Sequence, residues 1–181
     1  MSDTALSASG LVGGDANRIF AGKMRFLSPV CQRACAYAIA TAEANAKMYR
    51  IVACPTAGSC GILPSVLAAV SEEVNATMND MTRALFTAGA IGRVVAEKAS
   101  IAGAVGGCQA ECGTACAMAA AAAVDLLGGT ADEMENAFAL ALKNILGLVC
   151  DPIGGLVEVP CVKRNGFHAI HALVAVEMVM N

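Results

Sequence analysis

The chain reads as a series of helix-forming segments separated by short breaks rich in glycine and proline. Residues 1–28 are rich in glycine and weakly periodic, which is typical of a loop or a short helix. A capping-box pattern of Thr130 and Glu133 marks one helix start, Pro29 suits a first turn, and Asp80 is a candidate cap. Helices are predicted over 29–50, 65–73, 80–100, 110–127, 130–146 and 165–180. No stretch alternates as a strand would, so we expect an all-α, compact helical domain.

Composition narrows the class of protein. The 181 residues form one expected domain, 1–181, in which 57% of residues are hydrophobic and 15% are charged. The uncharged run near the middle of the chain, 112–124, has thirteen residues and is largely alanine, whereas a membrane span needs about 20. We therefore predict no membrane span, and a helical surface that is covered in part by a partner.

Charge and targeting signals point to the cytoplasm. The net charge is −3 and no basic stretch occurs, which argues against nucleic acid as a partner. The start, MSDTALSASG, lacks the basic segment and apolar run of a signal peptide. In a cytoplasmic chain the nine cysteines are expected to be reduced, and so to bind metal or to be buried.

Three cysteines stand in unusual surroundings, in GGCQAE (Cys108), GLVCDP (Cys150) and EVPCVKRN (Cys161). Three such thiols can hold three corners of an iron–sulfur cluster and leave one iron open to substrate. The alternative is that they are buried structural cysteines beside tight turns, and the spacing alone favours neither strongly. Cys112 and Cys116 are interpreted as small side chains at a tight helix–helix contact.

The segment CPTAGSCG is a second candidate site, because a glycine-flanked turn before a helix can bind an anion. Its residues Thr56, Gly58 and Ser59 suit a substrate carboxylate, although an ordinary interhelical turn explains the pattern equally well. His168 and His171 lie three apart and are interpreted as a packed or solvated face. Other polar groups in apolar surroundings either orient a substrate or satisfy the helical core: Glu43, Asn45, Gln109 and Glu111.

Three long motifs in order carry a family resemblance: EANAKMYRIVACPTAGSCGILP, ASIAGAVGGCQAECGTACAMAAAA and GLVCDPIGGLVEVPCVKRN. Together they resemble the α chain of the iron–sulfur-dependent L-serine dehydratases. The resemblance implies a [4Fe–4S] cluster bound by Cys108, Cys150 and Cys161 on Gly/Pro-rich loops, without pyridoxal phosphate. The open iron would act as a Lewis acid while L-serine becomes pyruvate and ammonia, a step in serine catabolism and gluconeogenesis.

The resemblance also implies partners. A β chain or β domain is required, and an oligomer is expected. Compared with the family the chain looks shortened at both ends, and no residue is assigned as the general base. Two alternatives stay open: a related cluster lyase such as a cysteine desulfidase, and an inactive, cluster-free helical fragment.

Overall fold

The computed structural model describes residues 4–181, and within them it is all-α, as predicted. The only strand-like feature there is an isolated bridge between Ile153 and Leu156. The described helices are α1 (Asp15–Ala21), α2 (Pro29–Ala46), α3 (Ile62–Val74), α4 (Met78–Lys98), α5 (Gly103–Leu126), α6 (Ala131–Lys143) and α7 (Val159–Met180).

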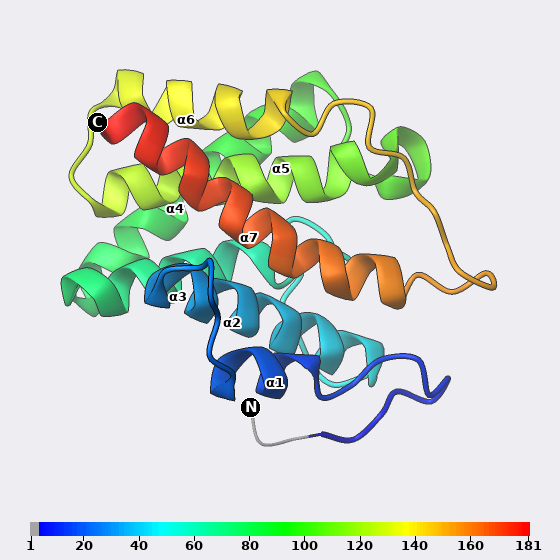
Figure 1. Ribbon diagram of the computed structural model, residues 1–181. Coiled ribbons are helices and arrows are strands. Elements are labelled where there is room, and N and C mark those ends of the chain that lie inside the picture. Colours follow the sequence, from blue (N-terminus) through cyan, green and yellow to red (C-terminus); the bar gives the residue numbers. More distant parts are fainter. Residues whose placement is uncertain (1–3) are drawn as a thin grey trace.

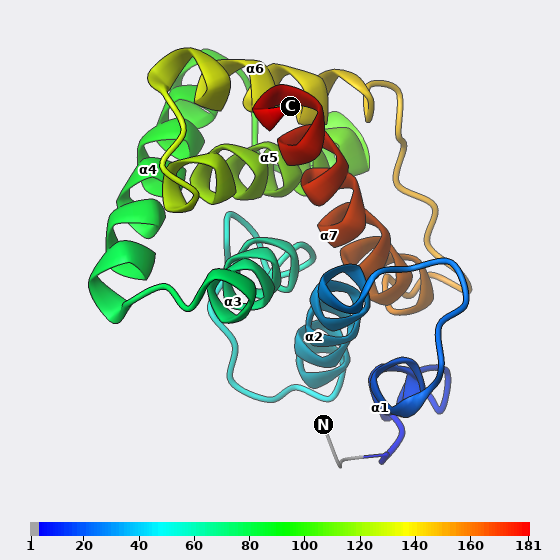
Figure 2. The ribbon, with the colours of Figure 1, turned by 60° about the vertical axis from the view of Figure 1, so that its left-hand side comes forward.

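Helix α5 is the centre of the molecule (Figures 1 and 2), and α3, α4, α6 and α7 pack around it. Every residue from Cys112 to Leu126 is buried, and seven of these 15 residues are alanine. Small side chains allow neighbouring helix backbones to come close, so a buried α5 needs no large residues. A second, smaller core joins α1, α2 and α7, with Ile39 and Val162 among its members.

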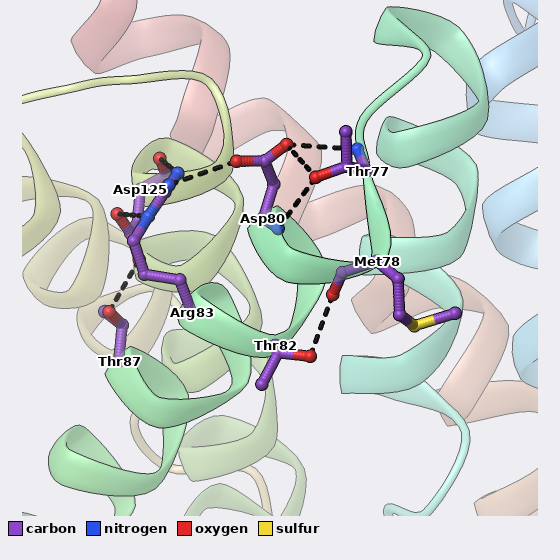
Figure 3. A network of polar contacts seen from close by, with 7 residues as sticks. All are labelled: Thr77, Met78, Asp80, Thr82, Arg83, Thr87 and Asp125. Atoms are coloured by element: carbon purple, nitrogen blue, oxygen red, sulfur yellow. Dashed lines mark hydrogen bonds and ion pairs between the residues drawn. The ribbon is translucent and has the colours of Figure 1, made fainter.

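A network of polar contacts connects α4 to the C-terminal end of α5 (Figure 3). Arg83 donates from Nε to Asp125 Oδ1 at 3.2 Å and from Nη2 to the Asp125 carbonyl at 3.2 Å. Thr87 donates to Asp125 Oδ2 at 2.7 Å. The nearly buried Asp125 carboxylate is therefore fully satisfied, which is the condition for burying a charge without a large penalty.

Helix starts and ends differ from the predictions where prolines and caps decide them. α3 begins at Ile62 and α7 at Val159, earlier than predicted, because Pro64 and Pro160 lie in first turns, where no N–H is needed. Thr77, and not Asp80, caps α4. Asp80 is the third helical residue and completes a capping box with it.

The capping box of Thr130 and Glu133 is present as predicted. Helix α2 ends at Ala46 rather than near residue 50, and Met48 then takes a left-handed conformation with φ of 62°. The buried Glu43 accepts a hydrogen bond from the Asp15 amide at 2.8 Å, so this carboxylate serves the helical core. Among residues 4–181, no helix has the length and apolar character that crossing a membrane requires.

Candidate functional site

A kink in α5 builds one wall of the site. Gly107 has φ of 70° and ψ of −168° inside the helix, a conformation that is open in practice only to glycine. A Cβ on Gly107 would lie 3.1 Å from the Leu148 carbonyl oxygen and 3.4 Å from the Cys150 amide nitrogen. The kink therefore brings the loop between α6 and α7 directly against the residue before Cys108.

Gln109 fixes that loop in place. Its backbone N–H donates to the Leu148 carbonyl at 2.8 Å, and its side-chain Oε1 accepts from the Gly147 amide at 2.7 Å. One residue thus holds two successive loop residues beside the α5 kink. This answers the question about Gln109 that the sequence left open: its side chain positions backbone.

The three predicted thiols converge at this point. Cys108 follows the kink and is buried, Cys150 lies in the exposed loop, and Cys161 lies in the first turn of α7. Cys108 and Cys150 both contribute to raising the pKa of Cys161, behind the larger effect of burial. The expectation that Gly/Pro-rich loops carry all three was wrong, because Pro160 starts α7 early and places Cys161 on the helix.

Cys108 has an environment that favours the thiolate. A hydrogen bond from Cys112 and the charge and hydrogen bond of Arg164 lower the pKa of Cys108 to about 6, against the opposing effect of burial. Burial, followed by the charges of Cys108 and Glu111, raises the pKa of Cys161 to about 12. One thiol of the three is therefore predisposed to carry negative charge.

Arg164 links α5 to the loop between α6 and α7 by contacts with negatively charged groups. Its Nη1 donates to Cys108 Sγ at 2.7 Å and lies 2.7 Å from Asp151 Oδ1 in the loop. The guanidinium is mostly buried, with 16% of its side chain exposed. It therefore neutralises negative charge inside the site rather than at the surface.

Asn165 joins α7 to the predicted anion-binding turn. Its Oδ1 accepts from the Gly61 amide at 2.8 Å, and its Nδ2 donates to the carbonyls of Gly58 and Cys161 at 2.7 Å each. The side chain is fully buried. The local sequence pattern predicts no role for Asn165, because two of its partners lie 104 and 107 positions away.

Asn165 links the turn to Cys161, but the hydroxyl groups of the turn face each other. Thr56 Oγ1 and Ser59 Oγ are 3.0 Å apart, and Ser59 is fully buried. Gly61 donates its amide to Asn165, whereas the amides of Gly58 and Ser59 have no acceptor within residues 4–181. These amide donors therefore remain at this turn for an anion.

The other cysteines and the histidines serve packing. Cys112 and Cys116 are completely buried, and Cys116 donates to the His168 carbonyl at 3.3 Å. His168 Nδ1 lies 2.7 Å from the Arg164 carbonyl, and His171 Nε2 lies 3.1 Å from that of Ala141. These contacts agree with the packed interpretation for all four residues.

Within the described part of the chain, no three His, Cys, Asp or Glu side chains stand close enough to hold a single metal ion. The fold and the site thus define an all-α domain with a thiol-rich polar site, built where the α5 kink, the first turn of α7 and two loops meet. The chain belongs to the serine dehydratase alpha chain family, whose model matches residues 1–181.

Curated relatives agree with that assignment. A Bacillus subtilis protein named "Probable L-serine dehydratase, alpha chain" is 53% identical over 96% of this chain and 59% of the relative. A Latilactobacillus sakei protein of the same name is 54% identical over 79% of this chain and 68% of the relative. The "L-serine dehydratase TdcG" of Escherichia coli is 44% identical over 80% of this chain and 32% of the relative. The chain thus spans about three fifths of the Bacillus subtilis relative and a third of the Escherichia coli one.

Proposed function

We propose that the chain is the α component of an L-serine dehydratase that converts L-serine to pyruvate and ammonia, using a [4Fe–4S] cluster held by Cys108, Cys150 and Cys161. The observation that carries the proposal is that the segments bearing these thiols meet at Arg164, one helical turn after Cys161. Its guanidinium contacts both Cys108 and Asp151, the neighbour of Cys150. The names of the relatives supply the reaction. No pyridoxal phosphate is part of the proposal.

The donor set fits such a cluster. Each cysteine of a cluster binds a different iron, so the absence of three ligands around one point among residues 4–181 does not conflict with a cluster. Cys108 already favours the thiolate, and thiolates are the form that binds iron. Arg164 would offset part of the negative charge that three thiolates bring.

When bound, the cluster would supply an iron with a free coordination position, a Lewis acid that makes the serine hydroxyl a better leaving group. The chain's own residues would orient the rest of the substrate. Asn165 fixes the turn at Gly58 relative to α7, and the free amides of Gly58 and Ser59 can donate hydrogen bonds to the substrate carboxylate. Thr56 supports Ser59 through their hydroxyl contact.

The overall chemistry balances without an oxidant. Serine loses hydroxide from Cβ and a proton from Cα, which gives 2-aminoacrylate and water. Aminoacrylate tautomerises to the imine, and hydrolysis of the imine by one water yields pyruvate and ammonia. The group that takes the α-proton is not assigned to any residue of this chain.

We further propose a β chain or β domain as partner, in an oligomeric enzyme of the cytoplasm. Apolar side chains are exposed next to the site, on the loop between α6 and α7 and at the start of α5: Val105, Val149, Ile153, Leu156 and Val157. A partner surface over this end would remove them from water. None of the nine cysteines, all of which lie within the described residues, forms a disulfide, and a reducing compartment suits such a chain.

The decisive experiment is anaerobic reconstitution with iron and sulfide, followed by visible absorbance, iron content and a serine-to-pyruvate assay with a β partner. The expected result is a brown protein with about four irons per chain and pyruvate formation. Replacing Cys108, Cys150 or Cys161 singly by serine should remove both. Cys116→Ser is the matched control, since a serine there can still donate to the His168 carbonyl, and it should keep both.

A colourless, iron-free but folded wild-type chain would refute the cluster. Loss of iron in Cys116→Ser together with retention in Cys161→Ser would refute the ligand set. A loaded enzyme that releases sulfide from L-cysteine but no pyruvate from L-serine would refute the substrate.

A further inference from the structure

Glu111 lies beside the thiols, and among residues 4–181 its carboxylate has no hydrogen-bond or ion-pair partner. It follows Cys108 by one helical turn on α5, and its carboxylate is wedged between two glycines of different segments. A Cβ on Gly58 would lie 1.8 Å from Glu111 Oε1, and a Cβ on Gly103 would lie 2.5 Å from Oε2. Only glycine at both positions leaves room for this carboxylate.

The carboxylate is half-buried, yet among residues 4–181 it has no hydrogen bond and no ion pair. Its charge is nevertheless felt around the site, where it contributes to raising the pKa of Cys60 and Cys161, behind the larger effect of burial. Arg164, the cation of the site, is already engaged with Cys108 and Asp151. A partly buried acid that lacks a partner costs stability unless a cation joins it.

We infer that Glu111 binds the α-ammonium group of the amino-acid substrate. The inference rests on the proposed function, which supplies an α-amino acid as ligand, and it adds a residue that selects for the amine. An ammonium has three N–H donors and a positive charge, and these match the two open oxygens of Glu111.

The placement gives the substrate a defined orientation. Oε1 lies against Gly58, whose amide is a free donor for a carboxylate. The ammonium and carboxylate of an amino acid are attached to the same carbon, so neighbouring acceptor and donor groups suit them. Cys108 lies one turn away on the same helix, so the third substituent of that carbon would point toward the thiols.

The test separates the amine from the rest of the substrate. In the reconstituted complex with the β partner, Glu111→Gln should raise the KM for L-serine by about tenfold or more, because a charge-assisted hydrogen bond is lost. The inhibition constant of 3-hydroxypropanoate, which keeps the carboxylate and hydroxyl but lacks the amine, should stay within about twofold, since it makes no use of that bond. Calorimetric binding of L-alanine, which cannot lose hydroxide, should weaken by the same factor as L-serine.

A second variant displaces Glu111 without removing its charge. Gly103→Ala places a methyl group against Oε2 and should raise the KM for L-serine while leaving 3-hydroxypropanoate inhibition unchanged. Gly89→Ala is the matched control, because a Cβ there meets nothing within 4 Å. Glu135→Gln, an exposed acid on α6, is the control for loss of charge.

Equal weakening of L-serine, L-alanine and 3-hydroxypropanoate in both site variants would overturn the inference, because a purely structural role affects all ligands alike. Unchanged L-serine and L-alanine binding would overturn it as well. Failure of the proposed function would look different, because the wild-type enzyme itself would then make no pyruvate. In that case the difference in affinity between L-alanine and propanoate would still show whether Glu111 binds the amine.

Discussion

Helix α5 contains two regions that differ sharply although they share cysteine spacing. Cys108, Cys112 and Cys116 follow one another at four-residue intervals. The part from Cys112 onward is surrounded by helices and almost entirely buried. The part before it carries the Gly107 kink and contacts a loop and a turn.

The surroundings, and not the spacing, decide what each thiol does. Burial raises the pKa of Cys116, whose Sγ–H donates to a backbone carbonyl of α7. Cys108, two turns earlier, receives hydrogen bonds from Cys112 and Arg164, and its pKa is lowered. The same residue type is thus an inert packing element in one region and a ready ligand in the other.

The largest expected effect comes from removing the kink. Gly107→Ala imposes a Cβ on a left-handed backbone beside the Leu148 carbonyl, so the helix should straighten and release the loop that holds Cys150. We expect loss of bound iron and a fall in activity of about 100-fold or more, with helical circular dichroism retained. Gly113→Ala on the same helix meets side chains alone, Leu142 at 3.3 Å and Ile145 at 3.8 Å, and should keep the iron. Equal iron contents in the two variants would show that the kink is not needed.

In the packed region we expect a substitution to lower stability without loss of bound iron. Ala120→Leu adds three carbons at a site with no exposed surface, and overpacking should lower the free energy of unfolding by about 3 kcal/mol. Iron content at low temperature should stay normal, because the kink is untouched. Ala96→Leu on the exposed face of α4 is the control, with an expected change within about 0.5 kcal/mol. Chemical denaturation measures both, and a stable Ala120→Leu would mean that α5 is loosely packed.

The sequence predicted the packed region better than the site. Alanine-rich stretches and the capping box of Thr130 and Glu133 are local signals, and the helices they predicted are present. The start of α7 was misplaced because Gly154, Gly155 and Pro160 read together as one loop, whereas the proline begins the helix. Local patterns fix helix existence more firmly than helix ends.

The site depends on contacts that no local pattern encodes. Asn165 binds a turn more than 100 positions earlier, and Glu111 occupies space left by Gly58 and Gly103 in two other segments. The three thiols could be selected from their Gly/Pro surroundings and from the family resemblance. The residues that position them could not, because their partners are brought together only by the packing of α5 against α7 and the turn.

Asn165→Ala should affect both stability and substrate binding, since the residue joins α7 to the turn at Gly58. It leaves the Gly61 amide and the Gly58 carbonyl without partners, and we expect a loss of about 2 kcal/mol in the free energy of unfolding together with a higher KM for L-serine. Asn144→Ala removes a single exposed bond to the Leu140 carbonyl and should change stability by less than about 0.5 kcal/mol. A variant that loses stability but keeps the KM would show that the turn does not need α7 to bind substrate.

The smallest expected effect is that of Thr56→Val, which should alter substrate binding but neither iron content nor stability. Thr56→Val keeps the shape of the side chain but removes the hydroxyl that contacts Ser59, 3.0 Å away. Ser59 is fully buried, so its hydroxyl then has only the Thr56 carbonyl at 3.5 Å, and the turn should loosen where its free amides face the substrate. The KM for L-serine should rise about threefold while iron content and stability stay near the wild-type values. Thr56→Ser, which retains the hydroxyl, should restore the wild-type KM; an unchanged KM in Thr56→Val would instead mean that this turn binds no carboxylate, and that its contact with Glu111 has only a structural purpose.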